Sequence, residues 1–162
     1  MQELKSTKHL IEIANRSNRL QFSPLEVKEL FAFLEKQSEF QVPSGTLSIA
    51  FLKDQEHTRI HQEYMDNSSS TDVITFPGDP DMGLSGEICV SVDFAEKSAQ
   101  FHKKSFDEEI TLYLLHGWLH LSGFDDRGEA ASKKMSQIQN KVFSRIQNAR
   151  LVPKFHLKEG NE

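Results

Sequence analysis

The chain has 162 residues with a formal net charge of −5, a size that fits one domain able to bury a core without a structural metal. Its one cysteine, Cys89, excludes an internal disulfide framework. The polar N-terminus and the absence of a long apolar run lead us to expect neither a signal peptide nor a membrane-spanning helix. We therefore expect a single domain over residues 1–162, with a flexible C-terminal segment over 150–162, in the cytoplasm and away from membranes.

Charge is distributed unevenly along the chain. Residues 127–162 hold eight lysines and arginines against three acids, a net charge of +5, which leaves −10 for the rest. The negative total disfavours general binding to nucleic acid, DNA included, because lysine and arginine drive the neutralisation of phosphates. A basic helix in this region would guide an anionic strand, although a solvated helix face gives the same pattern. The candidate substrate-binding residues on it are Lys133, Lys134, Lys141 and Arg145.

The first third of the chain predicts alternating strands and helices. Residues 9–14 are typical of a short strand, and residues 46–52 alternate into a second one. Ser23 and Pro24 predict a helix start, with the serine as N-cap and the proline in the first turn. A polar helix is expected over about 54–64. The apolar stripe of the first helix is predicted to consist of Leu30, Phe31, Phe33 and Leu34.

The rest of the chain predicts two further strands and then three helices. Residues 72–76 are expected to form a compact β-branched strand, and residues 86–92 a fourth strand. The stretch between them, residues 77–84, is rich in proline and glycine and is expected to be a mobile loop. Helical patterns follow from 93 to about 103, from 107 to about 121, and from about 127 to 148. Strands that precede helices predict an α+β fold, a small sheet packed by helices. The leucine-rich helix from 107 to 121 is expected at its centre.

The strongest chemical pattern lies in residues 116–126. His116 and His120 are four residues apart, so on a helix both imidazoles project from one face at the separation that two ligands of one zinc ion require. Gly123 permits a turn after the helix, which returns Asp126 towards the same metal. Helices of zinc proteases that bind metal through three protein groups use this spacing. The sequence therefore predicts a metal site formed by His116, His120 and Asp126.

Other interpretations of these residues stay open. A histidine in an apolar run is often a core residue bonded to a carbonyl group. Asp126 with Glu129 three residues later is also typical of a helix start, in which the aspartate is the N-cap. Asp125 fits either role, and the spacing favours Asp126 as the ligand and Asp125 as a cap or a supporting acceptor. Two histidines and a carboxylate also suit iron, nickel or manganese.

The catalytic residues are not evident from the pattern. Zinc proteases with the H-E-x-x-H motif have a glutamate directly after the first histidine, where this chain has Gly117, which argues against peptide hydrolysis by that route. Glu87 and Asp125 remain as candidates for a general base, and Glu87 is equally well a strand residue that faces water. Cys89 lies in an apolar stretch and is expected to be a packed side chain rather than a nucleophile.

Three segments in this order resemble the YbeY family of bacterial metal-dependent endoribonucleases, which act in 16S ribosomal RNA maturation. They are Tyr64 followed after six residues by Thr-Asp-Val-Ile-Thr-Phe-Pro at 71–77, then Gly-Glu-Ile at 86–88, then His-Gly-Trp-Leu-His-Leu-Ser-Gly-Phe-Asp at 116–125. The resemblance runs from about residue 46 to 146. It implies a zincin-like fold, in which a helix carries the zinc site at one end of a mixed four-stranded sheet.

The resemblance also implies a function. A member of this family is expected to hydrolyse single-stranded RNA in 16S 3′-end maturation and ribosome quality control, with the small ribosomal subunit as its partner. His116 and His120 match the first two metal ligands of the family. One zinc ion per chain would activate the water that attacks phosphorus.

Three positions depart from the family pattern. The third family ligand is a histidine where this chain has Asp126, whose negative charge makes the metal a weaker Lewis acid. Met65 replaces an arginine thought to contact the substrate phosphate, and methionine neither donates a hydrogen bond nor offsets charge. His61 stands where the family usually has asparagine. These departures keep a weakly active or non-catalytic ribosome-assembly factor open as an alternative, and after it a metallopeptidase.

Overall fold

The computed structural model describes residues 9–65 and 73–159, except for the side chains of His61, Tyr64 and Met65. The predictions made for those three side chains, and for residues 71 and 72, lie outside the described residues. No helix in the described ranges is long and apolar enough to cross a membrane. The elements are β1 (His9–Asn15), β2 (Leu20–Phe22), α1 (Pro24–Glu35), β3 (Gly45–Leu52), α2 (Asp54–Met65), β4 (Val73–Pro77), the 3-10 helix η1 (Pro80–Met82), β5 (Leu84–Ser91), α3 (Val92–His102), α4 (Phe106–Leu121), α5 (Glu129–Asn148) and β6 (Phe155–Leu157).

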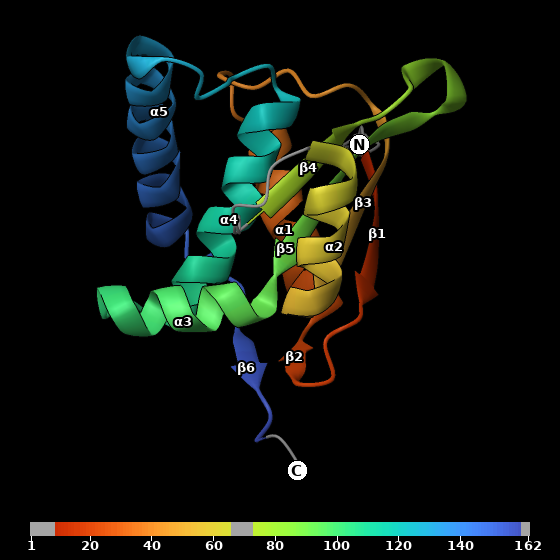
Figure 1. Ribbon diagram of the computed structural model, residues 1–162. Helices are drawn as coiled ribbons and strands as arrows, with labels where there is room; N and C mark the ends of the chain where they lie inside the picture. Colours follow the sequence, from red (N-terminus) through yellow and green to blue (C-terminus); the bar gives the residue numbers. More distant parts are fainter. Residues whose placement is uncertain (1–8, 66–72, 160–162) are drawn as a thin grey trace, which may run out of the picture.

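Four strands form the main sheet, in the order β1-β3-β5-β4 (Figure 1). The first three run parallel, whereas β4 is antiparallel to β5. The prediction of an α+β fold with a mixed four-stranded sheet is thus confirmed. Helices α1 and α2 make the connections that parallel strands require, since a hairpin cannot join them.

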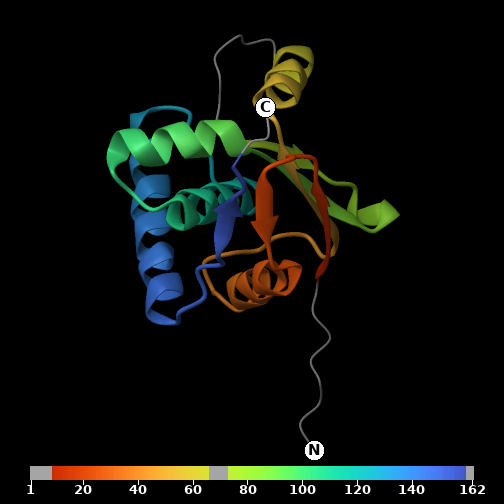
Figure 2. The ribbon, with the colours of Figure 1, turned by 90° about the horizontal axis from the view of Figure 1, so that it is seen from below.

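Helices cover both faces of this sheet. Figures 1 and 2 show α1 and α4 on one face, α2 on the other, and α5 outside α4. The side chains of β5 alternate between the two faces, as a strand dictates. Ile88 and Val90 enter the main core, whereas Cys89 packs in a small cluster with Ile60 of α2. Along β5, the even-numbered residues therefore face α4 and the odd-numbered residues face α2.

Helix α1 starts at the predicted residue but differs from the prediction in its N-cap. The buried side chains are Val27, Leu30, Phe31 and Leu34, a spacing of three, four and seven residues that places them on one helical face. Phe33 is partly buried and packs against the same core, at the margin of this face. Ser23 occupies the N-cap position, but its side chain makes no capping hydrogen bond.

Helix α4 lies at the centre of the packing, as predicted. It contacts β4, β5, α3 and α5, and its side chains are buried on several sides because neighbours surround it. Ser105 caps its N-terminus through a hydrogen bond of 3.1 Å from the Glu108 amide. The ring of Trp118, between the two histidines, packs against Phe31 of α1. The helix that carries the predicted ligands is thus held firmly by the core.

The C-terminal segment differs from the prediction of a flexible tail over 150–162. Within its described part, β6 pairs antiparallel with β2 (Figure 2). Phe155 is buried, and its backbone N–H donates to Asp107 Oδ1 at 2.7 Å. Burial of an aromatic ring stabilises this segment against the body of the protein, so residues 155–157 form a paired strand where a flexible tail was expected. Likewise, η1 forms within the stretch predicted as a loop over 77–84.

Candidate metal centre

The three predicted metal ligands lie together at the C-terminal end of α4, with His116 and His120 in its last turns and Asp126 beyond it. The Nε2 atoms of His116 and His120 are 3.1 Å apart. Each of the two histidines and Asp126 offers one ligand atom, and these atoms all lie within 4.8 Å of one another. The carboxylate is exposed, and the two histidines are partly buried. The cluster is therefore open to solvent on the side of Asp126.

The donor set fits a zinc ion. Two nitrogen ligands at about 2.0–2.1 Å from a tetrahedral metal are about 3.3 Å apart, close to the separation of the two Nε2 atoms. Two imidazoles and one carboxylate leave the fourth position of a catalytic zinc site for water or substrate. The geometry thus supports the ligand set that the spacing predicts.

A Schellman motif shapes the turn that brings Asp126 back. The Phe124 N–H donates to the Leu119 carbonyl, and the Gly123 N–H donates to the His120 carbonyl. Gly123 has a φ of 98°, a conformation that glycine adopts without strain. The chain reverses directly after the second histidine, and Asp126 reaches the metal position from the far side of the turn.

Asp125 and Asp126 have different roles in this turn. Asp125 Oδ1 accepts a hydrogen bond of 3.0 Å from the Arg127 N–H, which makes it part of a local turn. Helix α5 begins at Glu129 with Gly128 in the N-cap position and no side-chain cap. The alternative in which Asp126 is the N-cap is therefore wrong, as is the predicted helix start near Arg127. The carboxylate of Asp126 instead lies with the two histidines.

The surroundings of His120 favour the neutral form that a metal ligand needs. Burial is the main cause that lowers the pKa of His120, and the charge of His116 acts in the same direction. Asp126, a hydrogen bond with the Phe124 backbone and Asp125 oppose that shift. A lowered pKa favours the neutral imidazole, which is the form that binds metal.

His116 is oriented by a residue that the sequence did not indicate. Its Nδ1 lies 2.9 Å from Oε1 of Gln139, a partly buried side chain of α5. Gln139 follows the buried Met135 by four residues and so lies beside the face of α5 that packs inward. A glutamine at that position belongs to no metal-binding motif, so only the packing of α5 on α4 identifies it.

Glu87 does not lie with the histidines. Its neighbour Ile88 faces α4, where an added Cβ on Gly117 would lie 2.7 Å from it. Glu87 points to the other face and lines a groove of about 500 Å³ together with Arg59 and Glu63 of α2. The prediction of Glu87 as a general base near the metal is therefore wrong.

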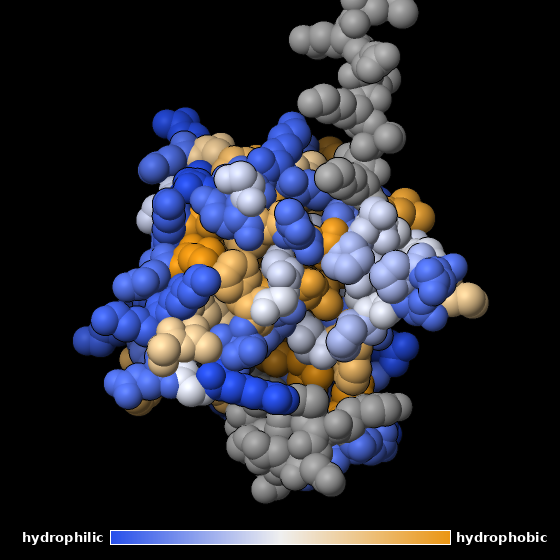
Figure 3. Space-filling model, turned by 90° about the horizontal axis from the view of Figure 1, so that it is seen from above, coloured by the Kyte–Doolittle hydropathy of each residue, from blue (hydrophilic) through white to orange (hydrophobic). Residues whose placement is uncertain are grey.

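The predicted basic residues of α5 fall into two groups. Lys133, Lys134 and Lys141 are exposed, and Lys134 Nζ lies 5.9 Å from the ring centroid of Phe124 in the metal-binding turn. Arg145 instead forms an ion pair of 2.8 Å with Glu39. Seen from above, hydrophilic side chains cover much of the surface, with separate hydrophobic areas between them (Figure 3). The three lysines, and not Arg145, are thus the cations available to a ligand.

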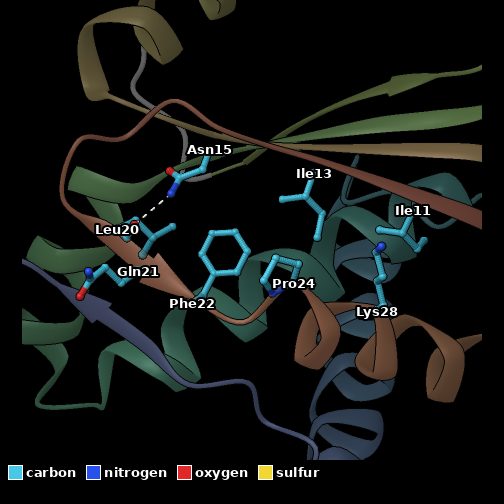
Figure 4. A pocket seen from close by; sticks show the side chains of 8 residues that line it. All are labelled: Ile11, Ile13, Asn15, Leu20, Gln21, Phe22, Pro24 and Lys28. Carbon is cyan, nitrogen blue, oxygen red and sulfur yellow. Dashed lines mark hydrogen bonds between the residues drawn. The ribbon is translucent and has the colours of Figure 1, made fainter.

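A separate groove of about 470 Å³ lies between β1, β2 and α1 (Figure 4). Lys28 is the one charged side chain among the eight that line it, beside apolar ones such as Ile13 and Phe22. Asn15, also in the lining, donates to the Leu20 carbonyl at 2.9 Å. Its lining provides no set of metal ligands, so the chemistry of the chain centres on the histidines.

Comparisons with known proteins concern the whole chain. A family model described as Endoribonuclease YbeY matches residues 12–147. A protein of that name from Aliarcobacter butzleri is 35% identical over 124 residues, which cover 65% of this chain and 89% of the relative. One from Staphylococcus aureus is 31% identical over 130 residues, or 74% of this chain and 83% of the relative. The solution structure of TM1509 from Thermotoga maritima has a TM-score of 0.55 at 21% identity, over 88% of this chain and 95% of that one, and supports the fold.

Proposed function

Because this chain belongs to the YbeY endoribonuclease family, we propose that it is a zinc-dependent endoribonuclease that cuts single-stranded ribosomal RNA in 16S 3′-end maturation and ribosome quality control. The observation that carries the proposal is the cluster of His116, His120 and Asp126, whose ligand atoms lie within 4.8 Å of one another. The relatives carry the endoribonuclease name. We place the protein in the cytoplasm with the small ribosomal subunit as its partner.

Each residue of the cluster has a defined part in this proposal. His116 and His120 bind the metal through Nε2, and Asp126 binds it through a carboxylate oxygen from the solvent side. Zinc held there supplies Lewis-acid chemistry, which polarises a phosphate oxygen and makes water acidic enough to attack at neutral pH. The charge of Asp126 weakens that effect compared with a third imidazole. We therefore expect cleavage to be slower than with three histidines.

The exposed lysines of α5 supply the contacts to the RNA backbone. Lys134 lies over Phe124, next to the metal-binding turn, and Lys133 and Lys141 are exposed on the same helix. Each lysine that neutralises a phosphate strengthens binding by releasing counterions. The RNA strand then runs along α5 and passes the cluster.

The test combines metal analysis with RNA cleavage on the purified protein and its Asp126→Ala variant. We expect about one zinc per chain in the wild type, a clear loss in the variant, and cleavage of single-stranded but not duplex RNA. A chelator should abolish cleavage, and added zinc should restore it. Absence of zinc from the wild type, or cleavage that survives complete removal of the metal, would contradict the proposal.

A second candidate is a ribosome-assembly factor with a retained metal site and no cleavage. The exposed carboxylate of Asp126 favours it, because a negative charge at the open side of the cluster repels an approaching phosphate. Zinc binding without cleavage of any single-stranded RNA, together with binding to the small ribosomal subunit, would select this candidate.

A further inference from the structure

We infer that Gln139 is a positioning residue for the metal centre, whose side-chain carbonyl holds the His116 ring with Nε2 towards the metal. The inference rests on the proposed function, because it concerns the same cluster. Gln139 is not a ligand itself. It lies on α5, whereas the two histidines that it would help to position lie on α4.

The two ring nitrogens of His116 have separate partners. Nδ1 lies 2.9 Å from Gln139 Oε1, and Nε2 lies 3.1 Å from the Nε2 atom of His120. A histidine that binds metal through Nε2 must carry its proton on Nδ1, where it needs an acceptor. The amide oxygen of Gln139 provides this acceptor, so it selects the tautomer of His116 that leaves the Nε2 lone pair free.

The position of Gln139 on α5 limits its movement. It lies between the buried residues Met135 and Val142, four residues after the first and three before the second. Its own side chain is partly buried. A side chain confined in this way loses little further entropy when it holds the imidazole, which is how a neighbouring residue pre-organises a ligand.

The two histidines are therefore held by different means. The groups that act on His120 belong to α4 and to the turn that ends it: His116, Asp126, Asp125 and the Phe124 backbone. His116 depends on a side chain that reaches it only when α5 is packed against α4. The metal affinity should thus respond to the residue at 139 even though that residue binds no metal itself.

The experiment measures zinc affinity by competition with a chromophoric chelator for three variants. Gln139→Leu removes the acceptor, Gln139→Glu keeps an acceptor and adds a charge, and Gln137→Leu is the matched control at an exposed position of the same helix. We expect Gln139→Leu to weaken zinc binding by about 10- to 100-fold. Gln139→Glu should bind zinc at least as tightly as the wild type, and Gln137→Leu should bind it equally.

The cobalt-substituted protein gives a second readout that does not depend on activity. Loss of the His116 orientation should change the visible d–d bands of cobalt in Gln139→Leu and leave them unchanged in Gln137→Leu. If the wild type binds zinc and Gln139→Leu binds it with the same affinity, the inference is overturned and the proposed function is not. A wild type that binds no zinc would overturn the proposed function as well. If Gln139→Leu fails to fold, weaker zinc binding by Gln139→Glu than by the wild type would overturn the inference.

Discussion

Cys89 shows how burial removes the reactivity of a side chain. Its thiol lies on the α2 face of β5 and donates to Glu87 Oε1 at 3.7 Å. Burial, and after it the nearby charge of Glu87, raises the pKa of Cys89 to about 12. The thiolate is the nucleophile of cysteine chemistry, so the native protein holds almost none of it at neutral pH. The structure thus agrees with the prediction of a packed side chain.

We predict that Cys89 resists alkylation in the native protein. At about pH 8 a free cysteine is partly ionised and reacts with iodoacetamide, whereas a raised pKa keeps Cys89 protonated until the pH approaches 12. Mass spectrometry of timed samples, with and without denaturing urea, measures the rate. Modification should be at least tenfold slower in the native protein. Equal rates in both samples would show that Cys89 is accessible.

The candidate metal ligands illustrate what the sequence reveals about single residues. His116, His120 and Asp126 were predictable because a helix and one turn fix their relative positions within a short stretch of chain. The choice between Asp125 and Asp126 needed the structure, in which Asp125 accepts from the Arg127 N–H. Gln139 was not predictable, because the packing of two helices, and no local spacing, places it beside His116.

The contact between α4 and β5 depends on Gly117. A Cβ at this position would lie 2.7 Å from Cγ2 of Ile88, a stiff β-branched side chain. The absence of a side chain lets the helix approach the strand closely, and both flanking histidines share that helix. Gly117 therefore sets the distance between α4 and the sheet, and with it the distance of His116 and His120 from the sheet.

We predict that Gly117→Ala destabilises the protein, although alanine is the better helix former. The gain in helix propensity is about 1 kcal/mol, whereas overpacking a well-filled core costs about 1–3 kcal/mol. Urea denaturation should show a net loss of up to about 2 kcal/mol in the free energy of unfolding. Ser136→Ala, at an exposed position of α5, is the control and should change it little. A stabilised Gly117→Ala variant would refute the close approach.

Long elements and short ones differed in how well the sequence predicted them. Helix α1 was indicated by its Ser-Pro start and its apolar stripe, and each strand of the main sheet has at least five residues. Strands β2 and β6 have three residues each, too few to show an alternating pattern. They pair across almost the whole length of the chain, so no local signal connects them.

Strand β6 packs at the end of the molecule opposite the three candidate ligands (Figure 1). Phe155 places its ring against Phe22 and Phe51, with ring centroids 5.6 and 5.7 Å away. The Lys158 N–H donates to the Arg19 carbonyl at 2.7 Å. Phe155 and Lys158 lie beyond residues 12–147, which the family model matches, whereas their partners lie within that range. The segment that looked like a tail therefore ties the last helix to the start of the chain.

We predict that Phe155→Ala strongly lowers stability and leaves the metal site intact. Truncating a buried phenylalanine costs about 3–5 kcal/mol, because the lost burial is accompanied by a cavity among Phe22, Phe51 and the helix α4. His156→Ala, at the exposed neighbouring position, is the matched control and should change the free energy of unfolding by less than about 0.5 kcal/mol. Both variants should bind zinc with wild-type stoichiometry below their unfolding temperatures, because the cluster lies at the other end of α4. A small effect of Phe155→Ala in urea denaturation would mean that β6 contributes little to the core, and loss of zinc from the folded variant would mean that the two ends of α4 are coupled.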